Sequence, residues 1–106
     1  MASAERGLSA PPEVVFNTAT DPARASAWLP GPLRGDGSPA EEFDAEELRA
    51  RWRGAGEWSG ELRVDPADSG GARVRLELDG GPDVERMADE ALTGLARVVA
   101  DNLQAG

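Results

Sequence analysis

The sequence predicts an α+β fold in which an antiparallel sheet packs on one long C-terminal helix, with two short helices near the N-terminus. Apolar and polar residues alternate strictly through most of residues 48–79, which is typical of half-buried strands. The apolar spacing then changes to three and four over residues 84–103, as in an amphipathic helix. Residues 11–30, PPEVVFNTATDPARASAWLP, contain two short helical patterns that each begin at a proline.

The first elements along the chain are short. Residues 2–9 predict a weak strand, because their apolar content is low. Pro12 suits the first turn of a helix, where its missing N–H is not needed. Thr20 or Asp21 can cap a second short helix, which ends at Pro30.

Residues 48–64 predict a β-hairpin closed by the loop Gly54-Ala55-Gly56. A symmetric register matches every cross-strand pair in character, and a one-residue slip would place arginines in the core. The predicted pairs are Arg53–Glu57, Trp52–Trp58, Ala50–Gly60, Arg49–Glu61 and Leu48–Leu62.

A third strand follows at residues 72–79, and like faces meet if Val64 opposes either Ala72 or Val74. The first register is preferred because it places opposite charges across from each other, whereas the second pairs like charges. The first sets Glu61 across from Arg75; the second sets Glu61 across from Glu77 and Arg63 across from Arg75.

The last segment predicts one amphipathic helix from about Asp83 to Leu103, whose apolar side covers the sheet. Acidic residues in its first turn complement the helix dipole. Gly94 lies in the middle of this helix, where glycine costs about 0.8–1.0 kcal/mol relative to alanine. We expect Gly94 to allow a close approach to the sheet.

Composition excludes several kinds of site. The chain of 106 residues lacks histidine, lysine, tyrosine and cysteine, so catalytic triads, Schiff bases and imidazole or thiolate metal sites are excluded. A metal site made of carboxylates alone remains open by composition. The best run for it, DPADSGG, does not match the spacing of a calcium loop and predicts a turn. We therefore expect no metal and no cofactor.

Charge and hydropathy narrow the partners. The formal net charge of −9 repels nucleic acid and anionic lipid, so neither is an expected partner. No apolar run approaches the roughly 20 residues of a membrane span, and the start of the chain lacks the signature of a signal peptide. We expect a cytoplasmic protein without stable membrane insertion; the sequence does not predict an oligomeric state.

The element order and the stretch APPEVVFNTATDPARASAWLP resemble the START-like, or SRPBCC, superfamily, which has the helix-grip fold and includes polyketide cyclases and lipid-transfer domains. GEWSGELRVDPADSGGARVRLEL is similar to the late hairpin of that family. By element order the resemblance covers nearly the whole chain, as a single domain of residues 1–106. Two features depart from it: residues 31–47 have lost most of one or two strands, and no histidine, tyrosine or lysine is present for a cyclase-like site.

The resemblance implies a ligand pocket between the sheet and the long helix, smaller than in longer relatives. With three tryptophans in the chain, it predicts a binding module for a small hydrophobic molecule or a lipid. Two alternatives remain: a cyclase or dehydratase acting through a buried carboxylate, and an interaction domain with a filled cavity. The candidate ligand-binding residues are Trp28, Trp52, Trp58, Gly60 and Leu95; the tryptophans also suit an ordinary aromatic core.

Overall fold

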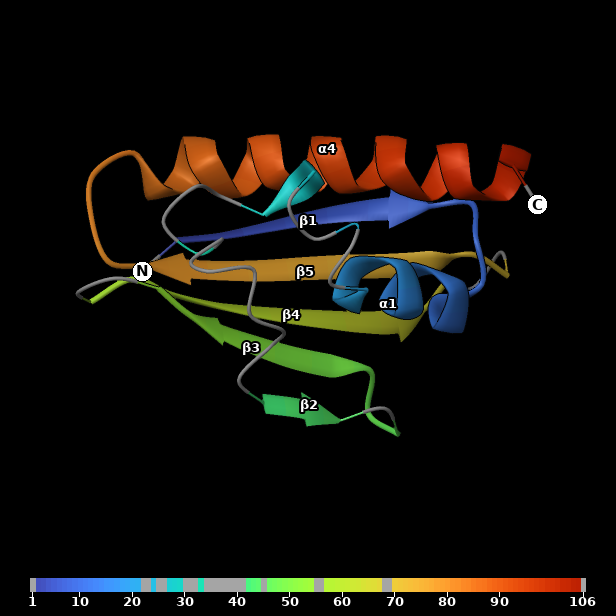
Figure 1. Cartoon of the computed structure of the whole chain (residues 1–106), viewed down its shortest axis with the longest axis horizontal. Coiled ribbons are helices and arrows are strands. Elements are labelled where there is room, and N and C mark those ends of the chain that lie inside the picture. The colour runs from blue at the N-terminus through green and yellow to red at the C-terminus, as the bar shows by residue number, and fades with distance from the viewer. Residues whose placement is uncertain are drawn as a thin grey trace.

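A computed structural model of the chain describes residues 2–21, 24, 27–29, 33, 42–44, 46–54, 57–67 and 70–105. Within these residues, five strands form one antiparallel sheet in the order β1-β5-β4-β3-β2, and a long helix lies along it (Figure 1). The predicted α+β class is confirmed. The elements are β1 (Ala2–Leu8), α1 (Pro12–Thr20), β2 (Glu42–Asp44), β3 (Arg49–Arg53), β4 (Ser59–Pro66), β5 (Ala72–Asp79) and α4 (Val84–Ala105).

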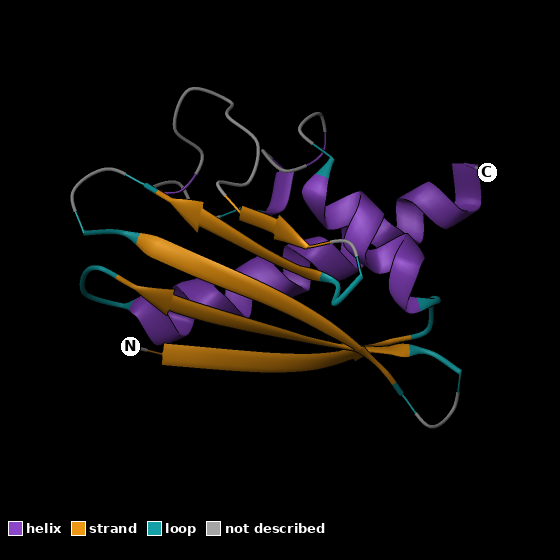
Figure 2. Ribbon diagram, turned by 90° about the horizontal axis from the view of Figure 1, so that it is seen from below, coloured by secondary structure: helices purple, strands orange, loops and turns teal. Residues whose placement is uncertain are grey.

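Both labelled helices cover the same face of the sheet, as the two views together show (Figures 1 and 2). Helix α4 packs along β1 and β5, while α1 packs on β4 and β5 and against α4. The alternation along the strands explains this layering, because the apolar side chains of β3, β4 and β5 are buried on the face that the helices cover. The charged side chains of these three strands lie on the opposite, outer face.

Helix α4 occupies the predicted segment to within two residues at each end. The weak first strand is also confirmed, since β1 pairs with β5 from Ala2–Leu78 to Leu8–Ala72. Of the second predicted short helix, Arg24, Ala27 and Trp28 are described and helical, whereas the chain bends at Leu29; residues 22, 23, 25, 26 and 30 lie outside the described ones. Most of residues 31–47, where one or two strands are predicted to be largely missing, also lies outside them, but the described part contains the short strand β2.

The predicted register of β3 and β4 is wrong by two residues. Trp52 opposes Gly60 and not Trp58, and Ala50 opposes Leu62. A shift of two keeps every side chain on its own face, so the alternation could not distinguish the two registers. The turn distinguishes them: the Gly54 N–H donates to the Trp58 carbonyl at 2.8 Å, which closes a longer loop than the predicted one.

The preferred register of β4 and β5 is also wrong, and the alternative is correct: Val64 opposes Val74, not Ala72. The Ala67 N–H donates to the Gly71 carbonyl at 3.0 Å, and this turn sets the pairing. Exposed ion pairs contribute only about 0–1 kcal/mol each, too little to override it. Glu61 and Glu77, which face each other, have arginine neighbours: Arg49–Glu61 (3.7 Å), Arg51–Glu61 (3.9 Å) and Arg75–Glu77 (3.5 Å).

Candidate functional site

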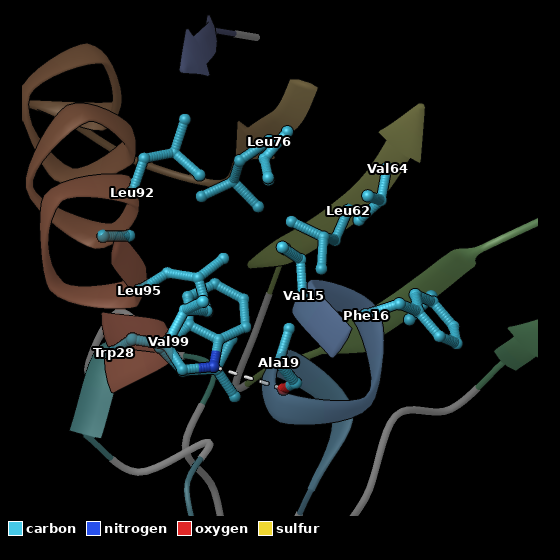
Figure 3. Close-up of a cluster of buried hydrophobic side chains, with 14 of the residues drawn as sticks. Val15, Phe16, Ala19, Trp28, Leu62, Val64, Leu76, Leu92, Leu95 and Val99 are labelled. Atoms are coloured by element: carbon cyan, nitrogen blue, oxygen red, sulfur yellow. Dashed lines mark hydrogen bonds between the residues drawn. The ribbon is translucent and has the colours of Figure 1, made fainter. Parts of the chain in front are cut away.

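Trp28 lies at the centre of the buried face, where it is only 3% exposed. Its indole N–H donates to the carbonyl of Ala19, near the end of α1, at 3.2 Å (Figure 3). Its ring meets Trp52 edge to face, with centroids 5.5 Å apart and planes at 84°. Trp28 therefore connects α1 with the sheet through one hydrogen bond and one aromatic contact.

Helix α4 covers the buried cluster on the side opposite the sheet. Leu95 is fully buried, and it projects into the same cluster as Leu92 and Val99 (Figure 3). One residue earlier, a Cβ added at Gly94 would lie 3.6 Å from the Cα and Cβ of Trp28. The expectation that Gly94 approaches the sheet is therefore wrong: Gly94 faces the segment that carries Trp28, because that segment lies between α4 and the sheet at this point.

Gly60 leaves a gap in the inner face of the sheet. Trp52, Gly60 and Leu78 oppose one another on β3, β4 and β5, so they form one row. The gap is filled from outside the sheet by Leu33, which is 3% exposed. A Cβ at Gly60 would lie only 2.6 Å from Cδ1 of Leu33. Sequence reasoning missed Leu33, because nothing near it in the chain indicates contact with β4.

Trp58 is separate from the other tryptophans. It lies just before β4, is half-buried and packs at the margin of the core. A Cβ at Gly81 would lie 2.7 Å from Cζ2 of Trp58, and one at Gly80 only 2.5 Å from its Cα. Trp58 therefore covers the two glycines that connect β5 to α4, whereas Trp28, Trp52, Gly60 and Leu95 belong to the central buried face.

Two hollows on the molecular surface lie elsewhere. One, of about 210 Å³, lies on the outer face of the sheet, on the side of Gly60 away from the helices. It is lined by Arg51, Arg53, Ser59, Gly60, Glu61, Glu77, Leu78 and Asp79. The other, of about 250 Å³, lies beside α1 and is lined by Val14, Asn17, Thr18, Asp21 and Arg24. Neither corresponds to the apolar pocket expected between α4 and the sheet, where Leu33 occupies the gap at Gly60.

The buried part of the described inner face is apolar, whereas Arg6, opposite Val74 on β1, is exposed. Among the described residues, Thr18 is the one buried polar side chain, and no carboxylate is buried. Every buried side-chain nitrogen or oxygen there has a hydrogen-bond partner. No group of three acidic residues among the described positions is placed to hold a metal ion. The site therefore offers apolar contact surface and no described group placed for proton transfer.

The length and apolarity of the helices bear on membrane insertion. Within the described ranges, no helix is both long and apolar enough to cross a membrane. The long helix α4 carries charged residues along its exposed side, among them Glu85, Arg86, Asp89 and Arg97.

Comparison with known proteins gives matches by structure. No protein-family model matches the chain, and no curated protein matches its sequence. The crystal structure of TTHA0849 from Thermus thermophilus has a TM-score of 0.74 and 22% identity, covering 95% of this chain and 97% of that one. Ara h 8.0201 has a TM-score of 0.63 and 14% identity, covering 98% and 97%.

A third similar structure is that of a protein from a biosynthetic pathway. The di-domain ARO/CYC StfQ of the steffimycin pathway has a TM-score of 0.63 and 19% identity; the match covers 95% of this chain and 44% of StfQ. The TM-scores show a shared fold, and at identities this low the likeness extends to the fold alone. The predicted helix-grip fold is thereby confirmed, since the chain shares the fold of these three structures.

Proposed function

We propose that the protein is a binding module for a small hydrophobic molecule or a lipid. The ligand lies between α4 and the inner face of the sheet, against Trp28, Trp52, Gly60 and Leu95, with Trp58 at the margin. The observation that carries the proposal is the gap at Gly60 in an otherwise apolar row, next to two indoles packed edge to face. Similarity to StfQ, an ARO/CYC protein of a biosynthetic pathway, supports a small-molecule ligand.

The walls indicate the chemistry of the ligand. The indole N–H of Trp28 already donates to Ala19, so it does not call for a polar ligand group. No charged side chain among the described residues is buried there. The buried part of the ligand is therefore apolar, and any charged end lies at the surface. Because Leu33 occupies part of the space, the ligand volume lies at or below the bottom of the usual range of about 300–1,000 Å³.

Tryptophan fluorescence tests the proposal. The chain is titrated with the neutral probe N-phenyl-1-naphthylamine, then with decanoate and a flavonoid. In Trp58→Leu the remaining fluorophores are the two buried indoles, Trp28 and Trp52. We expect saturable quenching or a blue shift that persists in this variant, because the ligand contacts the buried pair.

A matched pair of glycine variants locates the site. Gly60→Ala adds a methyl group where Leu33 already approaches, so it should weaken binding. Gly7→Ala adds the same group in β1 with nothing within 4 Å, so it should leave binding unchanged. Equal effects of the two variants would place the ligand elsewhere. Absence of a saturable signal with every probe would refute the binding function.

One alternative has an observation in its favour. Leu33 fills the gap at Gly60, as expected of an interaction domain whose cavity has closed. If no probe binds, this interpretation replaces the binding module. The cyclase or dehydratase alternative requires an inward carboxylate, and each carboxylate whose burial is described is exposed or half-buried.

A further inference from the structure

Leu33 stands where a strand residue would normally place its own side chain. Its Cδ1 lies 2.6 Å from the position of a Cβ at Gly60. The other neighbours of that position, the Glu77 carbonyl oxygen and Cδ1 of Leu78, both lie at 3.6 Å, an ordinary contact distance. Among these neighbours, Leu33 is the one whose side chain would have to shift to admit a side chain at position 60.

The backbone does not explain the glycine. The described glycines with positive φ are Gly70 and Gly80, so Gly60 has a conformation open to other residues. Glycine in a strand interior weakens the strand and marks a close approach of another group. Here the approaching group is a leucine side chain from outside the sheet. The absence of a side chain at position 60 thus keeps a space open for an inserted apolar group.

We infer that Leu33 is the residue that limits ligand size: its side chain occupies the deep end of the site, and a ligand binds fully only by displacing it. This inference rests on the proposed binding function. The ligand group takes the position of the Leu33 side chain and contacts Trp52 and Leu78, the neighbours of Gly60 in the row. Burial of one leucine side chain corresponds to about a 10- to 100-fold change in dissociation constant, so the exchange governs affinity.

Replacement of the Leu33 side chain also limits the size and polarity of the ligand group that enters the gap. A group that replaces one leucine side chain in a dry apolar site is a branched alkyl end or a single unsubstituted ring, since a cavity left by a buried aliphatic side chain, on the order of 150 Å³, binds benzene. A ligand whose only narrow end is charged would not fit. The ligand class is therefore a neutral or amphipathic molecule with one compact apolar end.

The test measures the dissociation constant of N-phenyl-1-naphthylamine by its fluorescence for wild type, Leu33→Ala and Leu92→Ala. Leu92 is the matched control, because both leucines are 3% exposed and Leu92 lies on α4. A double variant, Leu33→Ala with Gly60→Val, refills the gap from the strand. We expect Leu33→Ala to bind about tenfold more tightly than wild type, the double variant to return toward the wild-type value, and Leu92→Ala to show no gain.

The outcomes separate the inference from the function on which it rests. Equal affinity of wild type and Leu33→Ala would leave the binding function standing and overturn the role of Leu33. An equal gain in Leu92→Ala would overturn it too, because any cavity would then suffice. If no variant binds the probe, the binding function itself fails. Circular dichroism establishes that each variant is folded, and Leu33→Val, a smaller truncation, gives the same comparison if the alanine variant does not fold.

Discussion

Trp28 joins three parts of the molecule through a single residue. Its indole N–H donates to Ala19, its ring contacts Trp52, and its backbone lies near Gly94 of α4. The sequence predicts Trp28 as a candidate ligand-binding residue, and the structure buries it almost completely. At this scale one side chain links α1 to the sheet, in addition to the direct packing of α1 on β4 and β5.

Trp28→Phe should destabilise the fold by about 1–3 kcal/mol, because the Ala19 carbonyl, the acceptor in a buried hydrogen bond, loses its donor. Urea unfolding monitored by circular dichroism measures the change. Trp58→Phe is the control, since Trp58 is half-buried and packs at the margin of the core. A Trp28 variant no less stable than the control would show that the hydrogen bond contributes nothing.

Gly94→Ala should stabilise the protein by up to about 0.8–1.0 kcal/mol, because alanine is the better helix former and its Cβ meets Trp28 at 3.6 Å, an ordinary contact. The midpoint of thermal unfolding reports the gain. A lower midpoint would mean that α4 and the Trp28 segment lie closer together than the structure shows.

The β3–β4 hairpin shows what is determined at the scale of an element. Its alternation assigns Ala50, Trp52 and Leu62 to the buried face and the arginines to the outer face. The loop then selects the register, through the hydrogen bond from Gly54 to Trp58. Leu48, predicted as a strand residue opposite Leu62, instead lies in a turn with φ of 54°, and its carbonyl accepts from the Val64 N–H at 3.0 Å.

Engineered disulfides distinguish the two registers, because the chain has no cysteine of its own. Arg51 and Glu61 oppose each other in the structure, so Arg51→Cys with Glu61→Cys should oxidise readily. Arg51→Cys with Ser59→Cys, opposite in the predicted register, should not. Mass spectrometry without reductant detects the cross-link. Preferential oxidation of the second pair would restore the symmetric register.

Helix α4 should depend on the burial of Leu95. Leu95→Ala removes a fully buried side chain and should cost about 2–5 kcal/mol, whereas Arg97→Ala on the exposed side should have little effect. Chemical denaturation of both variants provides the comparison. Similar losses of stability would indicate that α4 does not pack on the sheet through Leu95.

Charge is divided unevenly over the whole molecule. Six of the eleven arginines lie on the outer face of the sheet, interleaved with carboxylates: Arg49, Arg51, Arg53, Arg63, Arg73 and Arg75. The net charge of −9 is carried by a chain with a radius of gyration of 12.6 Å. A compact molecule with such an excess of one sign is destabilised by self-repulsion.

Stability should therefore rise with salt. Between about 0.01 M and 0.1 M NaCl the screening length falls from about 30 Å to about 10 Å, so repulsion across the molecule weakens. We expect a higher thermal midpoint at the higher concentration. The double variant Glu90→Gln with Asp101→Asn neutralises two exposed acids and reduces the magnitude of the net charge from −9 to −7. Its thermal midpoint should therefore respond less to salt. A midpoint that falls with salt would mean that surface ion pairs outweigh the repulsion.

Much of the fold follows from the sequence alone. The period of two assigns each strand residue of 49–53, 59–64 and 72–79 to a face, and the period of three to four fixes α4, because burial of one face requires these spacings. The lack of histidine, lysine, tyrosine and cysteine excludes whole classes of chemistry before any coordinates are considered. Trp52 and Leu95 could be placed in the buried layer for the same reason.

The tertiary structure decided the two registers and the occupant of the gap at Gly60. A shift of two residues preserves every face, so the registers depend on turn hydrogen bonds that periodicity does not specify. Leu33 is distant from β4 in the chain, and its contact with Gly60 arises only when the chain folds back over the sheet. Local patterns specify which face a residue occupies, whereas a contact between distant segments depends on how the whole chain packs.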